Sequence, residues 1–361
     1  MRPALLSPVA WRDFLSMLSF LDKPSRAIRA AADLSDAYSF AAFPNAGLAN
    51  KLFVWARASC FAHLNQIPIL CSSWGVVHWG SLFRRDQRAR FYGKTFTGSS
   101  ALDPLRRSFV VASYARVHAS NVARLERPRS IPTLYVFSGY PATEDYFEQI
   151  REHRDLLRES LVRIVRSRHR ARLKSMIPPV IAVHVRAGDF RPLRDGEEFG
   201  RWGHVRAPLS YYLDLINGVR ALAGTCLPVT IFSDSSEGVV RSLLSLENTS
   251  MAERSPDIVD LLQLSRSKVL ITSPSSTFSY WAGFLSDAVV LTHPTLYKAA
   301  LRPETVDVRR FQGGALGSHQ TWPAELASAV DTEFARSGAV KEPRDWFLRT
   351  AASLASAQSN D

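Results

Sequence analysis

The chain has 361 residues, and its 45 lysines and arginines exceed its 33 aspartates and glutamates by 12 charges. This length is typical of two domains. Hydrophobic residues at 46% and charged residues at 22% are ordinary globular values, which excludes a mainly disordered chain. The positive charge favours a negatively charged partner: nucleic acid, an anionic membrane surface or a phosphorylated small molecule.

The cysteines indicate a reducing compartment. Cys60, Cys71 and Cys226 are too few and too scattered for a disulfide framework or a cysteine-based zinc site. Two long stretches without charged residues, 58–83 and 269–286, lack the ~20 mostly apolar residues of a membrane span. We therefore expect a cytoplasmic, soluble protein.

The first half of the chain has a weak strand–helix–strand pattern over residues 38–43, 49–64 and 68–71. An amphipathic stretch then runs from Glu144 to Met176, with apolar residues recurring at steps of three and four. It predicts one long helix, which the following two prolines end. We place the domain boundary there, between residues 1–177 and 178–361.

The second half alternates between strand and helix patterns. The predicted strands are 180–185, 229–232, 269–271 and 288–291, and the predicted helices are 209–222, 238–246, 258–264 and 276–284. Such alternation indicates a parallel sheet covered by helices, so the chain is predicted to be α/β. The tail after Thr350, rich in alanine and serine, is expected to fray.

Three segments stand out because each lies where a predicted strand ends and a helix or loop begins, the usual place for ligands in α/β sheets. In residues 44–53, a flexible turn leads into a helix whose first amides could face a ligand. A plain strand–turn–helix joint explains this segment equally well.

The second segment is His184-Val185-Arg186-Ala187-Gly188-Asp189-Phe190. A guanidinium at the end of a strand can hold two phosphate oxygens at once. An Arg186–Asp189 ion pair that fixes the loop is the structural alternative, and the residues alone do not decide between them.

The third segment, residues 273–281, places a run of hydroxyls before a helix that carries large aromatic side chains. The hydroxyls and the bare helix N-terminus would suit a diphosphate. An ordinary helix cap is the alternative, with the aromatic rings in the core, and for Trp281 we expect that packing role.

Several motifs are absent from the sequence. It contains no Asp-x-Asp pair, no Gly-x-x-x-x-Gly-Lys-Ser/Thr loop, and none of the commonest zinc or serine-hydrolase signatures. A phosphate site without a metal needs arginine and helix dipoles to neutralise charge, and the second and third segments supply both.

These segments resemble a known family. Residues 184–189 resemble the His-x-Arg-Arg-x-Asp signature of the α-1,2-fucosyltransferases, glycosyltransferase family 11. Gly47-Leu48-Ala49-Asn50-Lys51-Leu52-Phe53 is similar to that family's Gly-Leu-Gly-Asn-Gln-Leu-Phe. Three further matches follow the family's order: Ser138-Gly139-Tyr140 with Tyr146-Phe147, Ile231-Phe232-Ser233-Asp234, and Ser275-Ser276-Thr277-Phe278-Ser279-Tyr280-Trp281.

The resemblance implies a GT-B-like fold, with two Rossmann-type domains whose parallel sheets face a central cleft. It also implies fucose transfer from GDP-fucose to a glycan hydroxyl, with inversion, in α-1,2 linkage, and with no metal or cofactor. Residues 1–177 would be the acceptor-side domain. Residues 178–361 would bind GDP-fucose and carry the C-terminal helices.

The resemblance also implies site residues. Arg186 would bind the β-phosphate and stabilise the departing GDP, and Asp189 would orient the arginine or its loop. The other implied donor-binding residues are Gly47, Asn50, His184, Asp234, Ser276, Thr277 and Phe278. Asp195, Glu197, Glu198 and His204 are candidates for the general base by position, and among them we take Glu197 as catalytic.

Three departures from the family pattern leave alternatives open. Ala187 replaces the second arginine of the signature, Ala49 replaces a glycine, and Pro274 stands where an asparagine is common. A GDP-fucose-dependent transferase of other linkage or acceptor therefore stays possible, as does an inactive nucleotide-binding relative.

The remaining positive charge has no catalytic role in this interpretation. The arginines of residues 163–174 lack the interleaved aromatics of a nucleic-acid-stacking surface, so no nucleic-acid partner is expected. Weak peripheral docking on the inner face of the cytoplasmic membrane is expected instead, because anionic lipids attract such segments.

Overall fold

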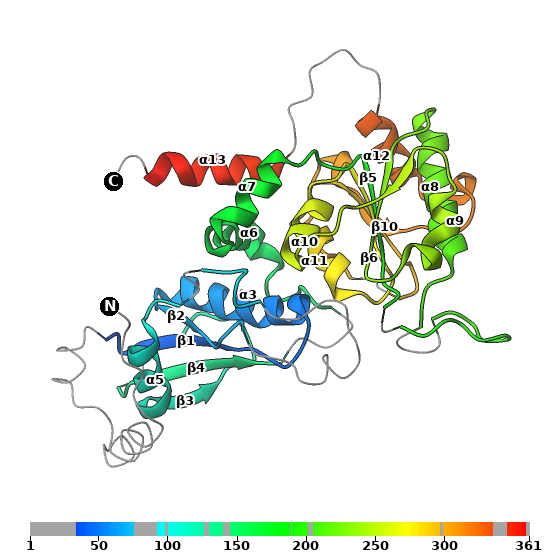
Figure 1. The fold of residues 1–361 in the computed structure, drawn as a ribbon. Helices are drawn as coiled ribbons and strands as arrows, with labels where there is room; N and C mark the ends of the chain where they lie inside the picture. The colour runs from blue at the N-terminus through cyan, green and yellow to red at the C-terminus, as the bar shows by residue number, and fades with distance from the viewer. Residues whose placement is uncertain are drawn as a thin grey trace, which may run out of the picture. The chain divides into compact units, whose positions relative to one another are not determined.

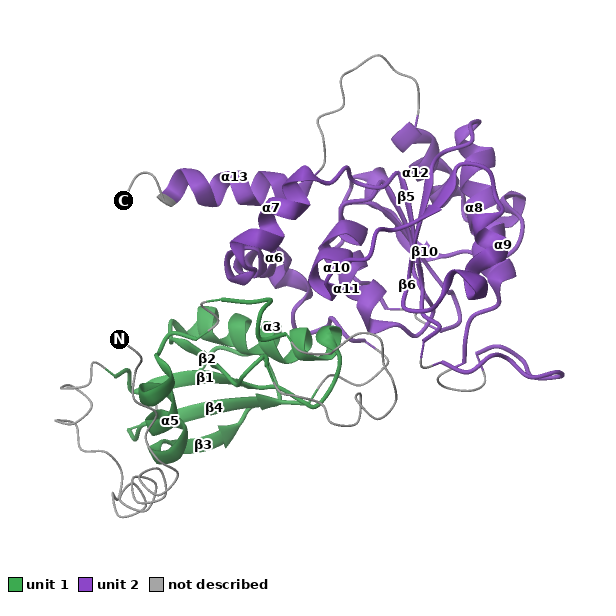
Figure 2. Cartoon of the chain, in the orientation of Figure 1, with its two compact units in different colours: residues 1–140 green, residues 141–361 purple. Residues whose placement is uncertain are grey.

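The computed structural model describes residues 34–75, 92–97, 100–125, 130–139, 145–188, 190–200, 205–296, 299–334 and 345–358. The chain divides into two compact units, residues 1–140 and 141–361 (Figure 2). Each unit contains one parallel sheet with helices, so the predicted α/β class with two Rossmann-type units is confirmed. Among the described residues, no helix is both long and apolar enough to cross a membrane.

Unit 1 is a four-stranded parallel sheet between two helices (Figure 1). The strand order is β2-β1-β4-β3, formed by β1 (Ala37–Ala42), β2 (Ile69–Cys71), β3 (Ala115–His118) and β4 (Thr133–Ser138). Helix α5 (Pro104–Ser113) covers one face, where Tyr38, Val110 and Leu134 share a core cluster. Helix α3 (Leu48–Asn65) covers the other, where Phe61 packs on Tyr135 and Phe137.

Unit 2 has a six-stranded parallel sheet in the order β10-β9-β8-β5-β6-β7. The strands are β5 (Ile181–Val185), β6 (Val229–Ser233), β7 (Thr249–Met251), β8 (Val269–Ile271), β9 (Val289–Thr292) and β10 (Gln312–Gly314). Its helices are α6 (Arg154–Ile164), α7 (Ser167–Ser175), α8 (Leu209–Ala223), α9 (Arg241–Leu244), α10 (Asp257–Ser265), α11 (Thr277–Leu285), α12 (Ala324–Phe334) and α13 (Trp346–Gln358). Short 3-10 turns stand at Arg151–His153, Glu237–Val240, Val308–Arg310 and His319–Thr321.

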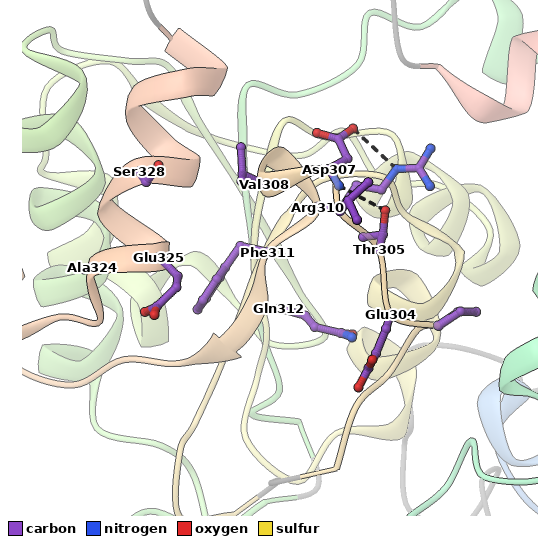
Figure 3. Close-up of a pocket in the computed structure, with 12 residues that line it drawn as sticks. Glu304, Thr305, Asp307, Val308, Arg310, Phe311, Gln312, Ala324, Glu325 and Ser328 are labelled. Atoms are coloured by element: carbon purple, nitrogen blue, oxygen red, sulfur yellow. Dashed lines mark hydrogen bonds and ion pairs between the residues drawn. The ribbon is translucent and has the colours of Figure 1, made fainter.

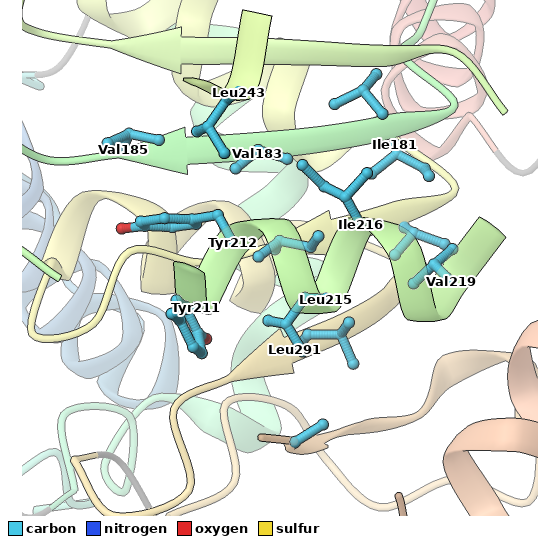
Figure 4. Close-up of a cluster of buried hydrophobic side chains, with 14 of the residues drawn as sticks. Ile181, Val183, Val185, Tyr211, Tyr212, Leu215, Ile216, Val219, Leu243 and Leu291 are labelled. Atoms are coloured by element: carbon cyan, nitrogen blue, oxygen red, sulfur yellow. The ribbon is translucent and has the colours of Figure 1, made fainter. Parts of the chain in front are cut away.

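The core of unit 2 lies between its central strands and α8 (Figure 4). Every residue of β5 is buried, as expected for a strand covered on both faces. Leu215, Ile216 and Val219 of α8 pack against this strand, and Leu291 of β9 joins the same cluster. Burial of each such side chain contributes about 1.5–3 kcal/mol of transfer free energy, so this packing holds the strand ends in place.

The single helix predicted over residues 144–176 is wrong. A 3-10 turn precedes α6, and the chain is extended at Val165 and Arg166 before α7 begins. That extended joint redirects the chain so that His169 and Leu173 are the buried face of α7, which packs on α10. The sequence shows one continuous pattern of apolar residues over 144–176 because both α6 and α7 are amphipathic.

The division between the units lies before α6, at residues 140 and 141, and not at the predicted 177 and 178. Arg154 and Arg158 of α6 donate hydrogen bonds to the carbonyl oxygens of Phe284 and Leu285, at the end of α11. Unit 2 therefore includes α6 and α7 along with its sheet.

The tail expected to fray is the helix α13. Trp346 and Phe347 at its start are fully buried, and Trp346 Nε1 donates a hydrogen bond to the Ser265 carbonyl oxygen at 3.3 Å. Asp345 just before it pairs with the buried Arg266, at 2.6 Å. Buried aromatic rings and an ion pair thus hold a helix whose later residues are mostly exposed.

One buried carboxylate joins α6 to the start of β9. Asp287 Oδ1 lies 2.8 Å from a guanidinium nitrogen of both Arg154 and Arg158, and its Oδ2 lies 3.1 Å from Arg349 of α13. Burial alone would raise the pKa of Asp287, but Arg158 and Arg154 hold it well below its usual range. The ionised form of Asp287 therefore stabilises the folded state.

Replacing Asp287 by asparagine should lower the free energy of unfolding at pH 7 by about 3–5 kcal/mol, because two buried guanidinium groups lose their counter-charge. Since the folded-state pKa of Asp287 is depressed, its contribution is present above the ordinary carboxyl pKa and is lost as the pH falls below it. Urea unfolding curves at pH 7 and pH 3 measure both effects.

Asp155→Asn is the matched control, because this carboxylate touches the same Arg158 at 3.6 Å but is 92% exposed. It should cost no more than about 1 kcal/mol. Equal losses for the two variants would contradict the role given to Asp287.

Candidate functional site

Polar residues from three strands meet at the carboxyl edge of the unit 2 sheet. Arg186 follows β5, Asp234 follows β6, and Ser273 comes two residues after β8. The register pairs Val185 with Ser233 in parallel, so these strands end side by side. This is the edge at which open α/β sheets bind ligands.

Asp234 accepts hydrogen bonds from both the side chain and the backbone of the loop after β5. Its Oδ2 pairs with the Arg186 guanidinium, and its Oδ1 accepts from the amides of Ala187 and Gly188 at 2.8 and 2.9 Å. Burial alone would raise the pKa of Asp234, but Arg186 and these two amides lower it below the usual value. A charged carboxylate thus sets the direction of the Arg186 side chain, which is 28% exposed.

Gly188 is required by this close approach. A Cβ at position 188 would lie 2.8 Å from Asp234 Oδ2 and 3.0 Å from its Cγ, closer than real contacts allow. A glycine at position 188 therefore admits the Asp234 carboxylate at the exit of the strand.

Ser273 fixes the backbone of Arg186 from the neighbouring strand. Its Oγ accepts from the Arg186 amide at 3.1 Å and lies 3.0 Å from the buried Tyr212 hydroxyl. The Ser273 amide in turn donates to Ser279 Oγ of α11, at 3.1 Å. Sequence reasoning missed both Ser273 and Tyr212 as parts of the site, although Ser273 opened a segment already singled out.

The turn before α11 has an uncommon backbone conformation. Ser275 has φ of +60°, in the left-handed region that non-glycine residues rarely adopt, and its amide donates to the Tyr280 hydroxyl at 2.8 Å. Such strain is found mainly at functional sites. Ser276 follows as the N-cap but makes no side-chain capping bond, and the first turn of α11 contains no acidic residue. This helix start is therefore suited to an anion.

The structure brings together most of the predicted donor-binding residues of unit 2. The buried His184 ring lies 5.2 Å from the Phe278 ring of α11, centroid to centroid. Ser276 and Thr277 stand at the N-terminus of the same helix. Trp281 is fully buried, so the expected packing role is confirmed.

Of the two acidic residues predicted to be catalytic, the structure describes Glu197 but not Asp189. Asp189 lies outside the described residues, as does His204. Glu197 lies in the loop after β5, where Arg191 holds both its carboxylate oxygens at 2.6 and 3.0 Å and the Arg194 amide donates to it at 2.9 Å. The Arg191 hydrogen bonds, followed by the Arg194 amide, lower the pKa of Glu197, which makes it a weaker base.

Gly47 and Asn50 belong to unit 1, at the N-terminus of α3. Gly47 is the N-cap, with extended backbone, and the first turn of the helix has no acidic side chain. This end of α3 follows β1, so it stands at the carboxyl edge of the unit 1 sheet.

A pocket of about 620 Å³ in unit 2 lies away from these residues (Figure 3). Its walls are the 303–312 segment leading into β10 and the first turns of α12, with the Phe311 ring beside Glu325. None of the predicted site residues lines it, and it opens at the start of β10, opposite the carboxyl edge. Within the described ranges, no group of three or more His, Cys, Asp or Glu side chains could hold a metal.

An arginine and an uncapped helix start at the carboxyl edge of a parallel sheet are features of α/β proteins that bind phosphorylated ligands. The family model of glycosyl transferase family 11 matches residues 106–309, more than half of the chain, and the chain belongs to this family. The protein is therefore a glycosyltransferase.

Three fucosyltransferases are among the solved structures that match the chain, each at low identity. NodZ alpha-1,6-fucosyltransferase soaked with GDP-fucose is 13% identical, with 70% of this chain and 92% of that chain covered and a TM-score of 0.42. An Arabidopsis thaliana FUT1 mutant in complex with GDP is 14% identical, with 81% and 78% covered and a TM-score of 0.42. POFUT1 in complex with GDP-fucose is 12% identical, with 70% and 95% covered and a TM-score of 0.38. No curated protein matches the chain.

Gly188→Ala should disrupt the Arg186–Asp234 arrangement. The added methyl group has no room beside the carboxylate, so we expect a loss of about 1–3 kcal/mol in unfolding free energy. The pKa of Asp234 should also rise as its amide hydrogen bonds are lost, which an NMR titration of the carboxyl carbon measures.

Gly238→Ala is the control, because the nearest atom to a Cβ there is Ser236 Oγ at 3.9 Å. If Gly188→Ala were as stable as Gly238→Ala and left the pKa of Asp234 unchanged, the steric argument would be wrong.

Proposed function

We propose that the protein transfers fucose from GDP-fucose to a hydroxyl group of a glycan acceptor, with inversion at the anomeric carbon, in α-1,2 linkage and without a metal. Membership of family 11 supports the reaction class. The observation that carries the proposal is the Arg186 guanidinium, held by Asp234 at the carboxyl edge of unit 2.

Donor binding is assigned mainly to unit 2, and acceptor binding to unit 1. Arg186 binds the β-phosphate, and Ser276 and Thr277 at the start of α11 bind the diphosphate. His184 and Phe278 contact the nucleoside, which their adjacent rings favour. Gly47 and Asn50 contribute to the donor site from unit 1.

In the reaction, the acceptor hydroxyl attacks fucose C1 from the face opposite GDP. The C1–O bond to the β-phosphate breaks with its electrons on the diphosphate, whose negative charge grows in the transition state. Arg186 and the N-terminus of α11 stabilise that charge, and they can take the role that a divalent cation has in other transferases. Holding donor and acceptor in line removes much of the bimolecular entropy cost.

Asp234 was expected to contact the nucleotide. In unit 2 its oxygens accept bonds from Arg186, Ala187 and Gly188, so we also give it the role of positioning Arg186. Asp189 stays assigned to orienting the arginine or its loop.

The acceptor hydroxyl must give its proton to a general base as the new C1–O bond forms. Glu197 was selected by position, but its bidentate pairing with Arg191 and its lowered pKa favour a role in holding the loop. Glu197→Gln distinguishes the two roles, because loss of a base removes transfer while loss of the ion pair loosens the loop.

Transfer to another hydroxyl or another acceptor is the second candidate, and Ala187 is the observation that favours it. This residue stands where the signature has a second arginine, and its side chain is 1% exposed within the core cluster beside β5. Residue 187 therefore packs in the core, and the donor site has one positively charged side chain fewer than the signature implies.

For location, we propose a cytoplasmic protein with weak contact to an anionic membrane face and no nucleic-acid partner. The surface that supports this is α7 and its continuation, where Arg168 and Lys174 are exposed and Ile177 is 87% exposed. Basic side chains beside an apolar one suit a lipid surface.

Arg186→Ala should lower kcat for GDP-fucose transfer by about 10²–10³, and Arg186→Lys should be nearly as inactive, because an ammonium cannot form the two-pronged contact. Transfer assays and linkage analysis of the product measure both the rate and the hydroxyl used. Arg241→Ala removes the same charge from an exposed site and should keep full activity. Wild-type turnover by Arg186→Ala would refute the assignment.

GDP and GDP-fucose should raise the unfolding temperature, and a chelator should leave this shift unchanged. A ligand at 100 times its Kd stabilises the folded state by about 2.7 kcal/mol, which a thermal-shift assay detects readily. A shift with UDP-sugars instead, or one that chelator abolishes, would contradict the donor or the metal-independent mechanism.

A further inference from the structure

The first turn of α3 carries a buried ammonium group that no described residue neutralises. Lys51 is 0% exposed, and nothing in the described part of the chain accepts a hydrogen bond from its Nζ. The Phe43 ring lies beside it, with 5.9 Å from Nζ to the ring centroid. A cation–π contact is worth up to about 2 kcal/mol, whereas burying an ammonium costs several kcal/mol. The ring therefore does not offset the burial.

The place of Lys51 in the helix adds to this cost. It is the fourth residue of α3, near the positive end of the helix dipole. The first turn has no acidic residue, and the N-cap Gly47 has no side chain to accept from the first amides. Two positive features thus lie together, and among the described residues no anion compensates them.

This group stands where a parallel sheet presents its ligand-binding residues. Phe43 follows β1 and Ser72 follows β2, and the Phe43 amide donates to Ser72 Oγ at 2.8 Å, which ties the two strand ends together. Helical side chains lean toward the N-terminus, so the Lys51 stem extends from α3 toward the turn of residues 43–47.

Aromatic rings line the same place. The Phe43 ring packs tilted against Trp74, and Trp74 packs tilted against Phe96, with 4.1 and 4.2 Å between centroids. Rings around an ammonium exclude water, and an ion pair formed there is stronger than one in solvent. Burial of the Lys51 ammonium group here costs free energy when no anion is bound and becomes favourable when an anion pairs with it.

We infer that Lys51, the turn of residues 43–47 and the N-terminus of α3 bind an oxyanion, a phosphate or a carboxylate, of a substrate. The inference rests on the proposed function for the choice of substrates: the oxyanion belongs either to the donor diphosphate or to an acidic sugar of the acceptor. The flexible four-carbon stem of lysine lets the ammonium leave the Phe43 ring when the anion arrives.

Lys51→Met tests this inference, because methionine keeps the apolar stem and removes the charge. Without ligand, the variant should unfold in urea at the same midpoint as wild type or a higher one, since an uncompensated charge is lost. Calorimetric titration with inorganic pyrophosphate and with glucuronate should show at least about tenfold weaker binding of one of them.

The affected probe identifies the source: pyrophosphate indicates the donor, and glucuronate indicates an acidic acceptor. Lys268→Met removes an exposed lysine that also lies beside a ring, with 5.7 Å from Nζ to the Phe334 centroid, and should bind both probes as wild type does. Three results would each overturn the inference. Lys51→Met could bind both probes as well as wild type does, wild type could bind neither probe, or Lys51→Met could have a lower urea midpoint than wild type. A GDP-fucose assay run alongside separates this outcome from failure of the proposed function, because a pyrophosphate effect without fucose transfer supports the oxyanion site alone.

Discussion

The Asp234 carboxylate organises the carboxyl edge of unit 2. It joins the end of β6 to the loop after β5 through one guanidinium and two amides. These bonds require a glycine at 188 and an ionised carboxyl group, and the side chain of Asp234 is 11% exposed. Without them Arg186 would be a flexible surface arginine, which loses more entropy on binding a phosphate than one already positioned.

The N-terminus of α11 is linked to Arg186 through Ser273. Its hydroxyl holds the Arg186 amide, and its amide is held by Ser279 of α11, so the arginine and the helix start are linked by two hydrogen bonds. A cation and a helix N-terminus at a set separation can bind two phosphate groups at once. This linkage explains why the strained Ser275 conformation is tolerated next to it.

The regular, buried elements could be predicted from the sequence because their signal is local. The strand predicted at 180–185 is Ile181–Val185, and the helix predicted at 209–222 is Leu209–Ala223. The edge strands β7 and β10 consist of polar and small residues, Thr-Ser-Met and Gln-Gly-Gly, and have no strand signal, whereas the equally short β8 is the buried apolar run Val-Leu-Ile. Arg186 could be found from its place after a strand, but the roles of Ser273 and Tyr212 depend on contacts between residues 61 or more positions apart.

Buried cationic side chains in this protein differ in whether the surrounding residues compensate their charge. Arg154 and Arg158 are buried with a carboxylate and with the carbonyl oxygens that end α11, so folding accounts for them. Lys51 has no such compensation in the described residues, and folding alone does not account for it. The chain has alanine at 187 where the family signature has arginine, and lysine at 51 where the family motif has glutamine. Relative to the family motifs, unit 2 thus has one cation fewer at its carboxyl edge, and unit 1 has one more at the start of α3.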